Sequence, residues 1–456
     1  ISQVNFLGTE RLDMREQCIA AISTAPAAGG VAIIRISGAG ALDIAESVFA
    51  PRGKTAVKNF RPRYMYAGNI KAAGNISDFG MCVYFRAPHS FTGEDVVELH
   101  CHGGVELSRA VLKSVLAAGA RPAKAGEFTM RAFVNGKISL SAAEGMADMI
   151  NGQSAAEVRA GSLLYSGRLT TAAEEAQDRL TDVLAKIGAD IDYPEEDIER
   201  TELSDIKCVI LNIKRDLDKL IATYDGGKKI KNGVSVAICG KPNAGKSSLL
   251  NAMLGYDKAI VSPSAGTTRD VVEGSLELGG VRFNLFDTAG VRESAGEIEQ
   301  LGIERAKQAL KSADLALIVY EGEYGMDERE LEEDCACPVI KVRNKRDISD
   351  NPDGAEDISV SALTGEGVEA LKSMMSARAL PSGAADEAFL IEERHYNALS
   401  RASGSLGSAA DAIGAFPADI VSVDIKEAWD ALGEITGATA TEEIIDTIFS
   451  KFCVGK

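Results

Sequence analysis

The first third of the chain alternates short apolar runs with glycine-rich segments. Apolar residues concentrate at 31–36, 81–85 and 95–99, and these runs have the length and composition of β-strands. Stretches with helical spacing lie between them, at about 41–49 and 105–118. We therefore expect residues 1–135 to form an N-terminal α+β domain.

The apolar spacing changes to that of long amphipathic helices in two later parts of the chain, residues 136–228 and 382–456. One helical face near the end of the chain combines Ile444, Ile445, Ile448, Phe449 and Phe452. The acidic segment 192–199 contains a proline and is expected to be a solvated turn rather than a metal site.

Strands and helices alternate between these two helical parts. Residues 226–233 and 381–387 are rich in glycine and polar residues and read as linkers. The predicted organisation is a multidomain α/β and α+β fold with limits 1–135, 136–228, 229–381 and 382–456. An α/β module at 229–381 would be inserted into one discontinuous helical domain.

Charge and composition exclude several classes of protein. The 456 residues contain 49 Lys and Arg against 67 Asp and Glu, a net charge of −18, which disfavours nonspecific binding to nucleic acid or anionic membranes. Apolar runs such as 315–320 are too short to cross a bilayer, and no leader is evident. Met14 is a candidate natural start, with residues 1–13 an extension. Eight scattered cysteines fit a reducing cytoplasm without disulfides.

A pair of histidines is a candidate metal-binding site. His100 and His102 are two positions apart on an expected strand and could share one face. No third or fourth ligand is spaced nearby, so we expect ordinary packed histidines and no metal here.

A phosphate-binding loop lies at 240–247, where GKPNAGKS follows an apolar strand and precedes a helix. Backbone N–H groups of such a loop surround the β-phosphate, and the helix N-terminus adds positive potential. Lys246 is expected to neutralise β- and γ-phosphate oxygens, and Ser247 to offer its hydroxyl to Mg²⁺.

Four further motifs follow in the order that a GTPase requires: GTTRD at 266–270, DTAG at 287–290, NKRD at 344–347 and SAL at 361–363. Thr268 can reach Mg²⁺ and the γ-phosphate, and Asp347 can accept the N1–H and amine of guanine, which adenine does not offer. The expected nucleotide contacts are Asn243, Ala244, Gly245, Lys246, Ser247, Ser248, Ser262, Gly266, Thr267, Thr268, Asp287, Thr288, Ala289, Gly290, Asn344, Lys345, Asp347, Ser361, Ala362 and Leu363.

Hydrolysis of GTP needs a group that orients water. Val291 follows the DTAG motif and cannot do so, so the catalytic residue must come from elsewhere. Glu293, Glu297 and Glu299 are the acidic candidates, and the residues alone do not choose among them.

Several motifs together carry a resemblance to a known family. They are GGVAIIRIS at 29–37, SFTGED at 90–95, HGG at 102–104, GEFT at 126–129, KPNAGKSSLLN at 241–251, DTAG at 287–290, GIER at 302–305 and FCVGK at 452–456. From about Met14 onward the chain resembles the tRNA modification GTPase family MnmE, also called TrmE. The resemblance implies a Ras-like G domain that hydrolyses GTP to GDP and phosphate.

The resemblance also implies roles for individual residues. Glu299 would be the catalytic carboxylate that orients water. A potassium ion would replace an arginine finger, held by Asn243, Ser262, Ser264 and Thr267, while Mg²⁺ would be held by Ser247 and Thr268. A one-carbon tetrahydrofolate (5,10-methylene or 5-formyl) would bind at a homodimer interface near Arg35, Glu98, Lys137 and Lys456. Cys453 would lie nearby without an assigned role.

The function implied by the resemblance is addition of a (carboxymethyl)aminomethyl group to C5 of the wobble uridine of certain tRNAs. The flavoprotein MnmG (GidA) would be the partner, carrying FAD and using NADH, and it would supply most of the tRNA-binding surface. A different class of function is a GTP-dependent assembly switch for ribosome biogenesis, similar to Era, without folate chemistry. That class predicts a basic RNA-binding module after the G domain, and residues 388–456 are not conspicuously basic.

Overall fold

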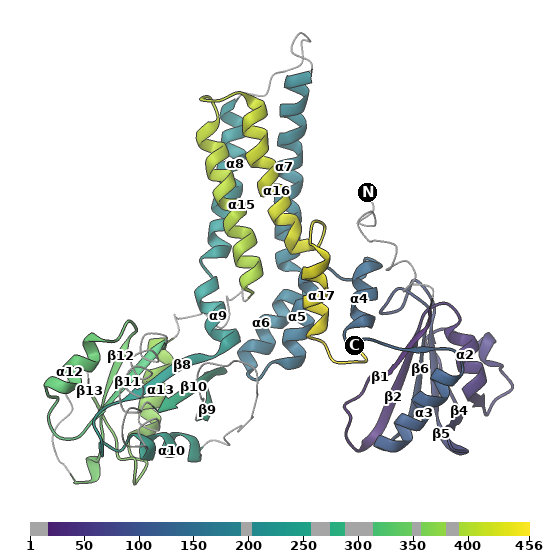
Figure 1. Ribbon diagram of the computed structural model, residues 1–456, viewed down its shortest axis with the longest axis horizontal. Helices are drawn as coiled ribbons and strands as arrows, with labels where there is room; N and C mark the ends of the chain where they lie inside the picture. Colours follow the sequence, from purple (N-terminus) through teal and green to yellow (C-terminus); the bar gives the residue numbers. More distant parts are fainter. Residues whose placement is uncertain (1–16, 193–202, 257–273, 288–312, 349–356, 380–391) are drawn as a thin grey trace, which may run out of the picture. The chain divides into compact units, whose positions relative to one another are not determined.

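The computed structural model describes residues 17–192, 203–256, 274–287, 313–348, 357–379 and 392–456 (Figure 1). The chain divides into two compact units. The first comprises 1–147, 164–203 and 412–456, and the second comprises 148–163 and 204–411. Neither unit is continuous in sequence, so each is built by segments that are far apart along the chain.

The first unit contains a seven-stranded sheet with the order β3-β4-β5-β6-β2-β1-β7. All neighbours are antiparallel except β1 and β7. The strands are β1 Ile19–Ile22, β2 Gly29–Ser37, β3 Phe49–Pro51, β4 Met65–Ala72, β5 Ile76–Phe85, β6 Val96–Gly103 and β7 Arg121–Pro122. The predicted strands at 31–36, 81–85 and 95–99 correspond to β2, β5 and β6.

Helices α2 Ala41–Val48 and α3 Val105–Ala117 cover one face of this sheet, as their predicted positions between strands suggested (Figure 1). Their apolar sides and the inward-facing strand residues form a core that includes Ile34, Ile36, Leu99 and Val111. A short 3₁₀ turn, η1 Val57–Asn59, closes the edge beside β3. The opposite face of the sheet remains partly apolar and exposed.

The C-terminal helix of the chain belongs to this first unit. Helices α4 Glu127–Val134 and α5 Leu140–Asn151 form a second core with α17 Glu442–Ser450, in which Leu140 packs with Ile445, Ile448 and Phe449. The predicted apolar face near the chain end is therefore buried. Thr441 caps α17 by accepting the Ile444 N–H at 3.4 Å.

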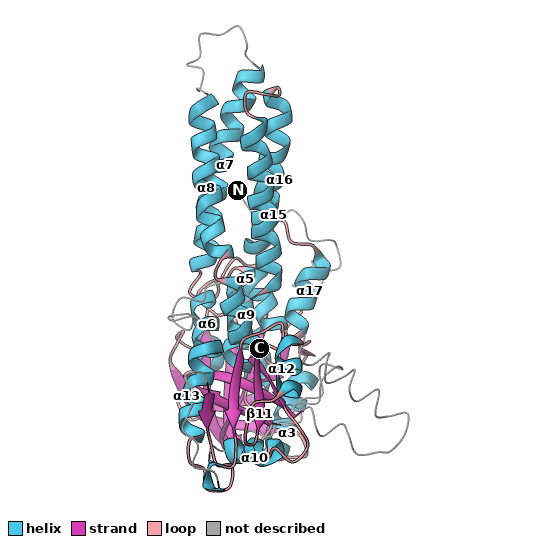
Figure 2. Ribbon diagram, turned by 90° about the vertical axis from the view of Figure 1, so that its left-hand side faces the viewer, coloured by secondary structure: helices cyan, strands magenta, loops and turns pink. Residues whose placement is uncertain are grey.

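Two long helices of the first unit, α7 Arg168–Asp192 and α16 Ala418–Thr436, lie side by side (Figure 1, Figure 2). Gln177 Nε2 donates to the Trp429 carbonyl at 2.9 Å, and Trp429 Nε1 donates to Thr181 Oγ1 at 3.0 Å. The amphipathic pattern predicted for 136–228 and 382–456 is thus realised by pairing helices from the two separate parts.

The second unit contains a six-stranded sheet with the order β13-β12-β11-β8-β10-β9. Only β9 runs antiparallel to its neighbour, which is β10. The strands are β8 Val234–Cys239, β9 Gly274–Leu278, β10 Val281–Asp287, β11 Leu315–Tyr320, β12 Val339–Arg343 and β13 Asp357–Ser359. β11 is buried along its whole length, which explains its continuous apolar sequence.

The sheet is accompanied by α10 Lys246–Tyr256, α12 Met326–Glu333 and α13 Val368–Ala379, with a short 3₁₀ turn, η2 Arg346–Ile348. Helices α6 Ala155–Tyr165, α8 Leu203–Ile221 and α15 Glu393–Ala412 complete this unit. Ser403 Oγ of α15 donates to Asp218 Oδ1 of α8 at 2.5 Å. Among the described residues, none of the helices has the length and apolar character of a membrane span.

The linker predicted at 226–233 is wrong, because most of this segment is helix α9 Tyr224–Asn232. Ile230 is 1% exposed, and its burial, together with the good helix formers Lys228, Lys229 and Lys231, outweighs the two glycines. Lys231 Nζ lies 2.9 Å from Asp148 Oδ1 and also pairs with Glu392. The helix ends at Gly233, where φ is 79°. The second predicted linker and most of the acidic turn at 192–199 lie outside the described residues.

Candidate nucleotide-binding site

The loop at 240–245 connects the end of β8 to the start of α10, as the motif predicted. Its glycines are required by space as well as by conformation. A Cβ at Gly240, where φ is 140°, would lie 2.0 Å from the Val319 carbonyl oxygen, and one at Gly245 would lie 2.2 Å from Asn344 Nδ2. Asn243 adopts the left-handed region at φ 65°. The sequence spacing therefore reflects a backbone that only these residue types accept.

Lys246 is held inside this loop. Its side chain is 6% exposed, and Nζ donates to the carbonyl oxygens of Gly240 at 2.9 Å and Lys241 at 2.8 Å. An ammonium kept at the loop entrance by two neutral acceptors can exchange them for charged phosphate oxygens, which are stronger acceptors.

Two oxygen atoms that could bind a metal ion lie together beside the first turn of α10. Ser247 Oγ donates to Asp287 Oδ2 at 2.7 Å, and Asp287 is the last residue of β10, which pairs directly with β8. A hydroxyl and a carboxylate are hard oxygen ligands and therefore fit Mg²⁺. Ser248 follows at the helix surface.

The segment predicted to bind the base is joined to the phosphate loop by Asn344, which is 3% exposed. Its Nδ2 donates to the Ala244 carbonyl at 2.9 Å, and its Oδ1 accepts the Ala362 N–H at 3.1 Å. One side chain thus connects three sequence motifs, since its partners lie 100 positions before it and 18 positions after it.

Asp347 is fixed by the last of these motifs. Ser361 Oγ donates to Asp347 Oδ1 at 2.6 Å and accepts the Thr364 N–H at 3.2 Å. Lys345 has a left-handed backbone at φ 64° and pairs with Glu321, while Leu363 is 85% exposed. The carboxylate that the sequence predicts to bind guanine is therefore held by a neighbour that the sequence also singled out.

Other predicted residues of this site lie outside the described residues. They are Ser262, Ser264, Gly266, Thr267, Thr268, Thr288, Ala289, Gly290, Glu293, Glu297 and Glu299. Their roles stay predictions.

The N-terminal unit holds the second set of predicted site residues. Arg35 and Glu98 are direct partners in the β2–β6 register, with Arg35 Nε 2.9 Å from Glu98 Oε1. The guanidinium also lies 5.7 Å from the ring centre of Phe128 and 5.9 Å from that of Phe91. Burial acts to raise the pKa of Glu98, but His100 and Arg35 outweigh it and lower that pKa, so the carboxylate is charged at neutral pH.

The remaining two predicted folate residues have other contacts. Lys137 Nζ donates to the Pro88 carbonyl at 3.1 Å. Lys456 is carried by a tail that docks on the segments following β1 and β7: Val454 pairs with Ala125, and Ser23 Oγ donates to the Gly455 carbonyl at 3.0 Å. Cys453 is exposed.

The two histidines contact different carboxylates. His100 Nε2 lies 3.4 Å from Glu98 Oε2, and His102 Nδ1 lies 2.6 Å from Asp78 Oδ1. Within the described ranges, no group of three or more His, Cys, Asp or Glu residues is placed to hold a metal ion.

Comparison with known proteins assigns the family. Residues 18–137 match the family model described as GTP-binding protein TrmE N-terminus, and residues 140–453 match that of the MnmE helical domain. The tRNA modification GTPase MnmE of Clostridioides difficile (strain 630) is 38% identical, with 97% of this chain and 99% of that protein covered. That of Symbiobacterium thermophilum is 39% identical, covering 97% and 100%.

The chain belongs to the MnmE family. It is therefore a tRNA modification GTPase with an N-terminal TrmE domain, a helical domain and a P-loop G domain. Among solved structures, the G domain of the T. maritima FeoB iron transporter matches at 28% identity and a TM-score of 0.26, covering 32% of this chain and 98% of that one. Era of Aquifex aeolicus matches at 29% identity and 0.27, covering 38% and 66%.

Sequence reasoning missed a buried ion network behind two of the MnmE motifs. Arg131, 3% exposed, lies 2.9 Å from Glu94 Oε2 and 3.1 Å from Glu127 Oε1. Glu127, 1% exposed, also accepts from Arg121 at 2.9 Å and from the Lys124 N–H at 2.8 Å. Glu94 belongs to SFTGED and Glu127 to GEFT, so these motifs hold strand and helix ends together. A glutamate inside each short motif was the available signal.

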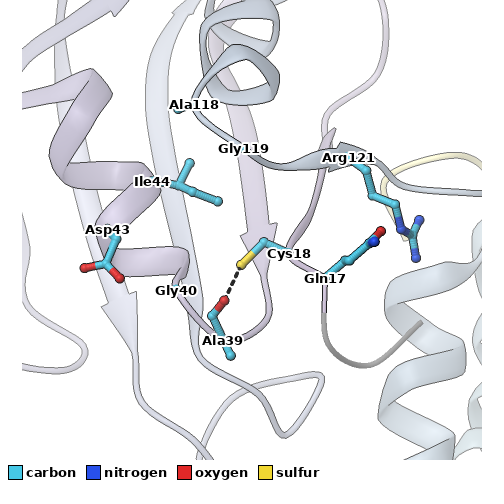
Figure 3. Close-up of a pocket in the computed structure, with 9 residues that line it drawn as sticks. All are labelled: Gln17, Cys18, Ala39, Gly40, Asp43, Ile44, Ala118, Gly119 and Arg121. Atoms are coloured by element: carbon cyan, nitrogen blue, oxygen red, sulfur yellow. Dashed lines mark hydrogen bonds between the residues drawn. The ribbon is translucent and has the colours of Figure 1, made fainter. Parts of the chain in front are cut away.

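A cavity of about 300 Å³ lies next to this network, at the start of α2 (Figure 3). Cys18 Sγ donates to the Ala39 carbonyl at 2.8 Å at its edge. Burial, followed by the charge of Glu94, raises the pKa of Cys18 to about 11, so its thiol stays protonated and is not a nucleophile. The cavity was not predicted from the sequence.

Proposed function

We propose that this GTPase is potassium-activated and works with the flavoprotein MnmG. Together they would add a (carboxymethyl)aminomethyl group to C5 of the wobble uridine of certain tRNAs, using a one-carbon tetrahydrofolate. The observation that carries the proposal is the charged Arg35–Glu98 pair, in the same compact unit that holds the docked tail with Lys456.

The predicted folate residues suit the two ends of this ligand. A carboxylate accepts hydrogen bonds from the amino edge of a pterin, and lysines such as Lys137 and Lys456 suit its glutamate tail. The bound folate would supply the one-carbon unit. Phe91 and Phe128 keep the Arg35 guanidinium in place, which limits the orientations that a ligand can adopt.

Calorimetry with 5-formyl-tetrahydrofolate tests this site. Lys137→Ala should weaken binding roughly tenfold or more, because a hydrogen bond to a charged group contributes about 1.5–3 kcal/mol. Lys113→Ala on α3 is the matched control and should bind normally. Undetectable binding to the unsubstituted protein would exclude the folate proposal.

Potassium is proposed because the resemblance to the MnmE family implies a potassium ion that supplies positive charge at the β–γ bridge in place of an arginine finger. Asn243 is its one described ligand candidate. GTP hydrolysis in KCl should be roughly tenfold or more faster than in NaCl at equal ionic strength. Equal rates would rule out the cation site.

A homodimer is proposed through the open face of the N-terminal sheet. Val31, Met65, Phe79 and Met81 share this face by strand register and are 57%, 46%, 44% and 44% exposed. A patch of this kind favours burial against a second copy. Light scattering should report a dimer, and Met81→Asp should shift it toward monomer; a monomeric unsubstituted protein would contradict the proposal.

The reaction itself is tested on cytoplasmic tRNA from a strain that lacks the gene. Mass spectrometry of the wobble uridines should show loss of the aminomethyl-type modification, and the same loss is expected without MnmG. The net charge of −18 supports a division of labour in which MnmG provides most of the tRNA contacts. Unchanged wobble uridines with defective ribosome assembly would favour an Era-like switch instead.

A further inference from the structure

Two cysteines lie in the short connection between α12 and β12. Cys335 and Cys337 are separated by one residue, and the chain bends at Ala336 and Cys337. Both thiols are partly exposed, and both pack against a small core of Ala237, Cys239 and Ala316. Neither residue takes part in the nucleotide site described above.

The two thiols lie in one cluster of side chains. Cys335 Sγ donates to the Leu331 carbonyl at 3.1 Å. Side-chain hydrogen bonding with Cys335 lowers the pKa of Cys337 and raises that of Cys335, so one thiol is the better nucleophile and the other keeps its proton.

The third cysteine of the group differs in environment. Cys239 is 2% exposed in β8, and burial raises its pKa to about 12. Its side chain therefore packs as a buried apolar group and is not a reaction partner. Two residues of an extended chain span about 7 Å at most. The bend at Ala336 and Cys337 shortens that span, which favours the α-carbon separation that a disulfide bridges.

We propose that Cys335 and Cys337 form a dithiol pair that hydrogen peroxide oxidises reversibly to a disulfide. The Cys337 thiolate attacks a peroxide oxygen, the O–O bond breaks, and a sulfenic acid forms with release of one water. The Cys335 sulfur then attacks the Cys337 sulfur, the S–S bond forms, and the hydroxyl leaves with the Cys335 proton as a second water. Two thiols are oxidised and one peroxide is reduced, and an external thiol restores the pair.

Helix α12 connects this pair to the phosphate loop. At its first turn, Asp327 Oδ2 and Glu328 Oε1 lie 3.1 and 3.2 Å from Lys241 Nζ, and Lys241 belongs to the GKPNAGKS motif. Closing a disulfide at the other end of the helix acts on an element that contacts the nucleotide loop. The inference does not depend on the proposed tRNA chemistry, because the thiols can be read directly.

The tryptic peptide of residues 330–341 contains both cysteines and no others, which makes the test direct. The full-length protein is treated with peroxide, alkylated and digested. We expect this peptide to lose two hydrogen atoms and take no alkyl label, and to regain two labels after dithiothreitol. Exposed Cys208 and Cys453 should still be alkylated at the same peroxide dose.

Two serine variants distinguish the roles. Cys335→Ser should leave a sulfenic acid on Cys337 that dimedone traps, and Cys337→Ser should leave Cys335 unreacted at that dose. The inference is overturned if the peptide keeps two alkyl labels when Cys208 is already oxidised. It is equally overturned if Cys337 is found cross-linked to the peptide of Cys239. Unchanged circular dichroism of the variants checks that they fold.

Discussion

The Lys246 side chain forms hydrogen bonds with the backbone of its own loop. Two backbone carbonyls hold its ammonium at 2.9 and 2.8 Å, so the residue is already positioned before phosphate arrives. Since the rotamer is restrained by burial, less side-chain entropy is lost when a nucleotide binds. The same restraint means that removing this side chain affects nucleotide affinity more than it affects the fold.

Lys246→Ala is expected to lower GDP affinity roughly 30-fold, since a charge-assisted hydrogen bond contributes about 2 kcal/mol. Fluorescent-nucleotide titration measures this. Lys219→Ala removes a lysine that is 67% exposed and paired with Asp216, and serves as the control with normal affinity. Equal affinity of both variants would contradict the role of Lys246.

Asp347→Asn should change the base that is bound. An amide offers a donor where guanine also donates, so GDP affinity should fall by roughly two orders of magnitude, or about 3 kcal/mol. Xanthine carries a carbonyl at that position and accepts the new donor, so XDP affinity should rise. Competition titrations with the two nucleotides decide; a parallel loss of both would mean that the loop has collapsed.

At the scale of elements, the N-terminal sheet is joined to α4 by charges rather than by apolar packing alone. Glu127 is buried and bonded to two arginines, and burial acts to raise its pKa, but Arg121, the Lys124 N–H and Arg131 outweigh that effect and lower it. Because the folded pKa is below the usual 4.5, the stabilisation is complete above about pH 4.5 and is lost as the pH falls through the folded value.

Glu127→Gln should therefore destabilise the first unit by roughly 3 kcal/mol at neutral pH, because it removes the buried carboxylate that Arg121 and Arg131 share, while Arg131 keeps its contact with Glu94. It should also flatten the loss of stability on acidification below about pH 4.5. Denaturant unfolding monitored by the emission of Trp429, the single tryptophan of the chain, measures both effects. Glu106→Gln, an exposed partner of Arg109, should change neither.

Sequence patterns predicted the elements whose geometry is local. The glycine spacing of the phosphate loop and the apolar run of β2 were sufficient to predict both elements, because the loop backbone requires glycine and a strand within a sheet favours such a run. The Glu94–Arg131 pair joins residues 37 positions apart, and nothing local marks a glutamate that will be buried. Helix α9 was mistaken for a linker because its two glycines suggested a turn, while the packing of Ile230 depends on tertiary contacts.

At the scale of the whole molecule, the tail and the first strand form one structure. Gly455 has φ 103°, and a Cβ there would lie 2.2 Å from the Ile22 carbonyl oxygen. The left-handed backbone of Gly455 thus fixes the position of the tail that ends in Lys456. The last segment, 412–456, belongs to the same compact unit as the first sheet.

Gly455→Ala should release this tail, through both the steric clash and the left-handed φ. We expect trypsin to cleave after Lys451 faster than in the unsubstituted protein, as followed by mass spectrometry. Gly119→Ala provides the control, since its φ is 116° but nothing lies within 4 Å of the added Cβ. Equal cleavage in the two variants would show that the clash does not hold the tail.

The docked tail has a consequence for synthesis on the ribosome. Ser23 and Gly455 are 432 positions apart, and at 5–20 residues per second a ribosome needs roughly 20–90 s to make the chain between them. During that time the nascent N-terminal domain lacks α17, so the apolar side chains of Leu140, Ala143 and Ala147 lack the α17 side of their core. Chaperones that bind apolar surface should therefore engage this domain until translation approaches the final segment.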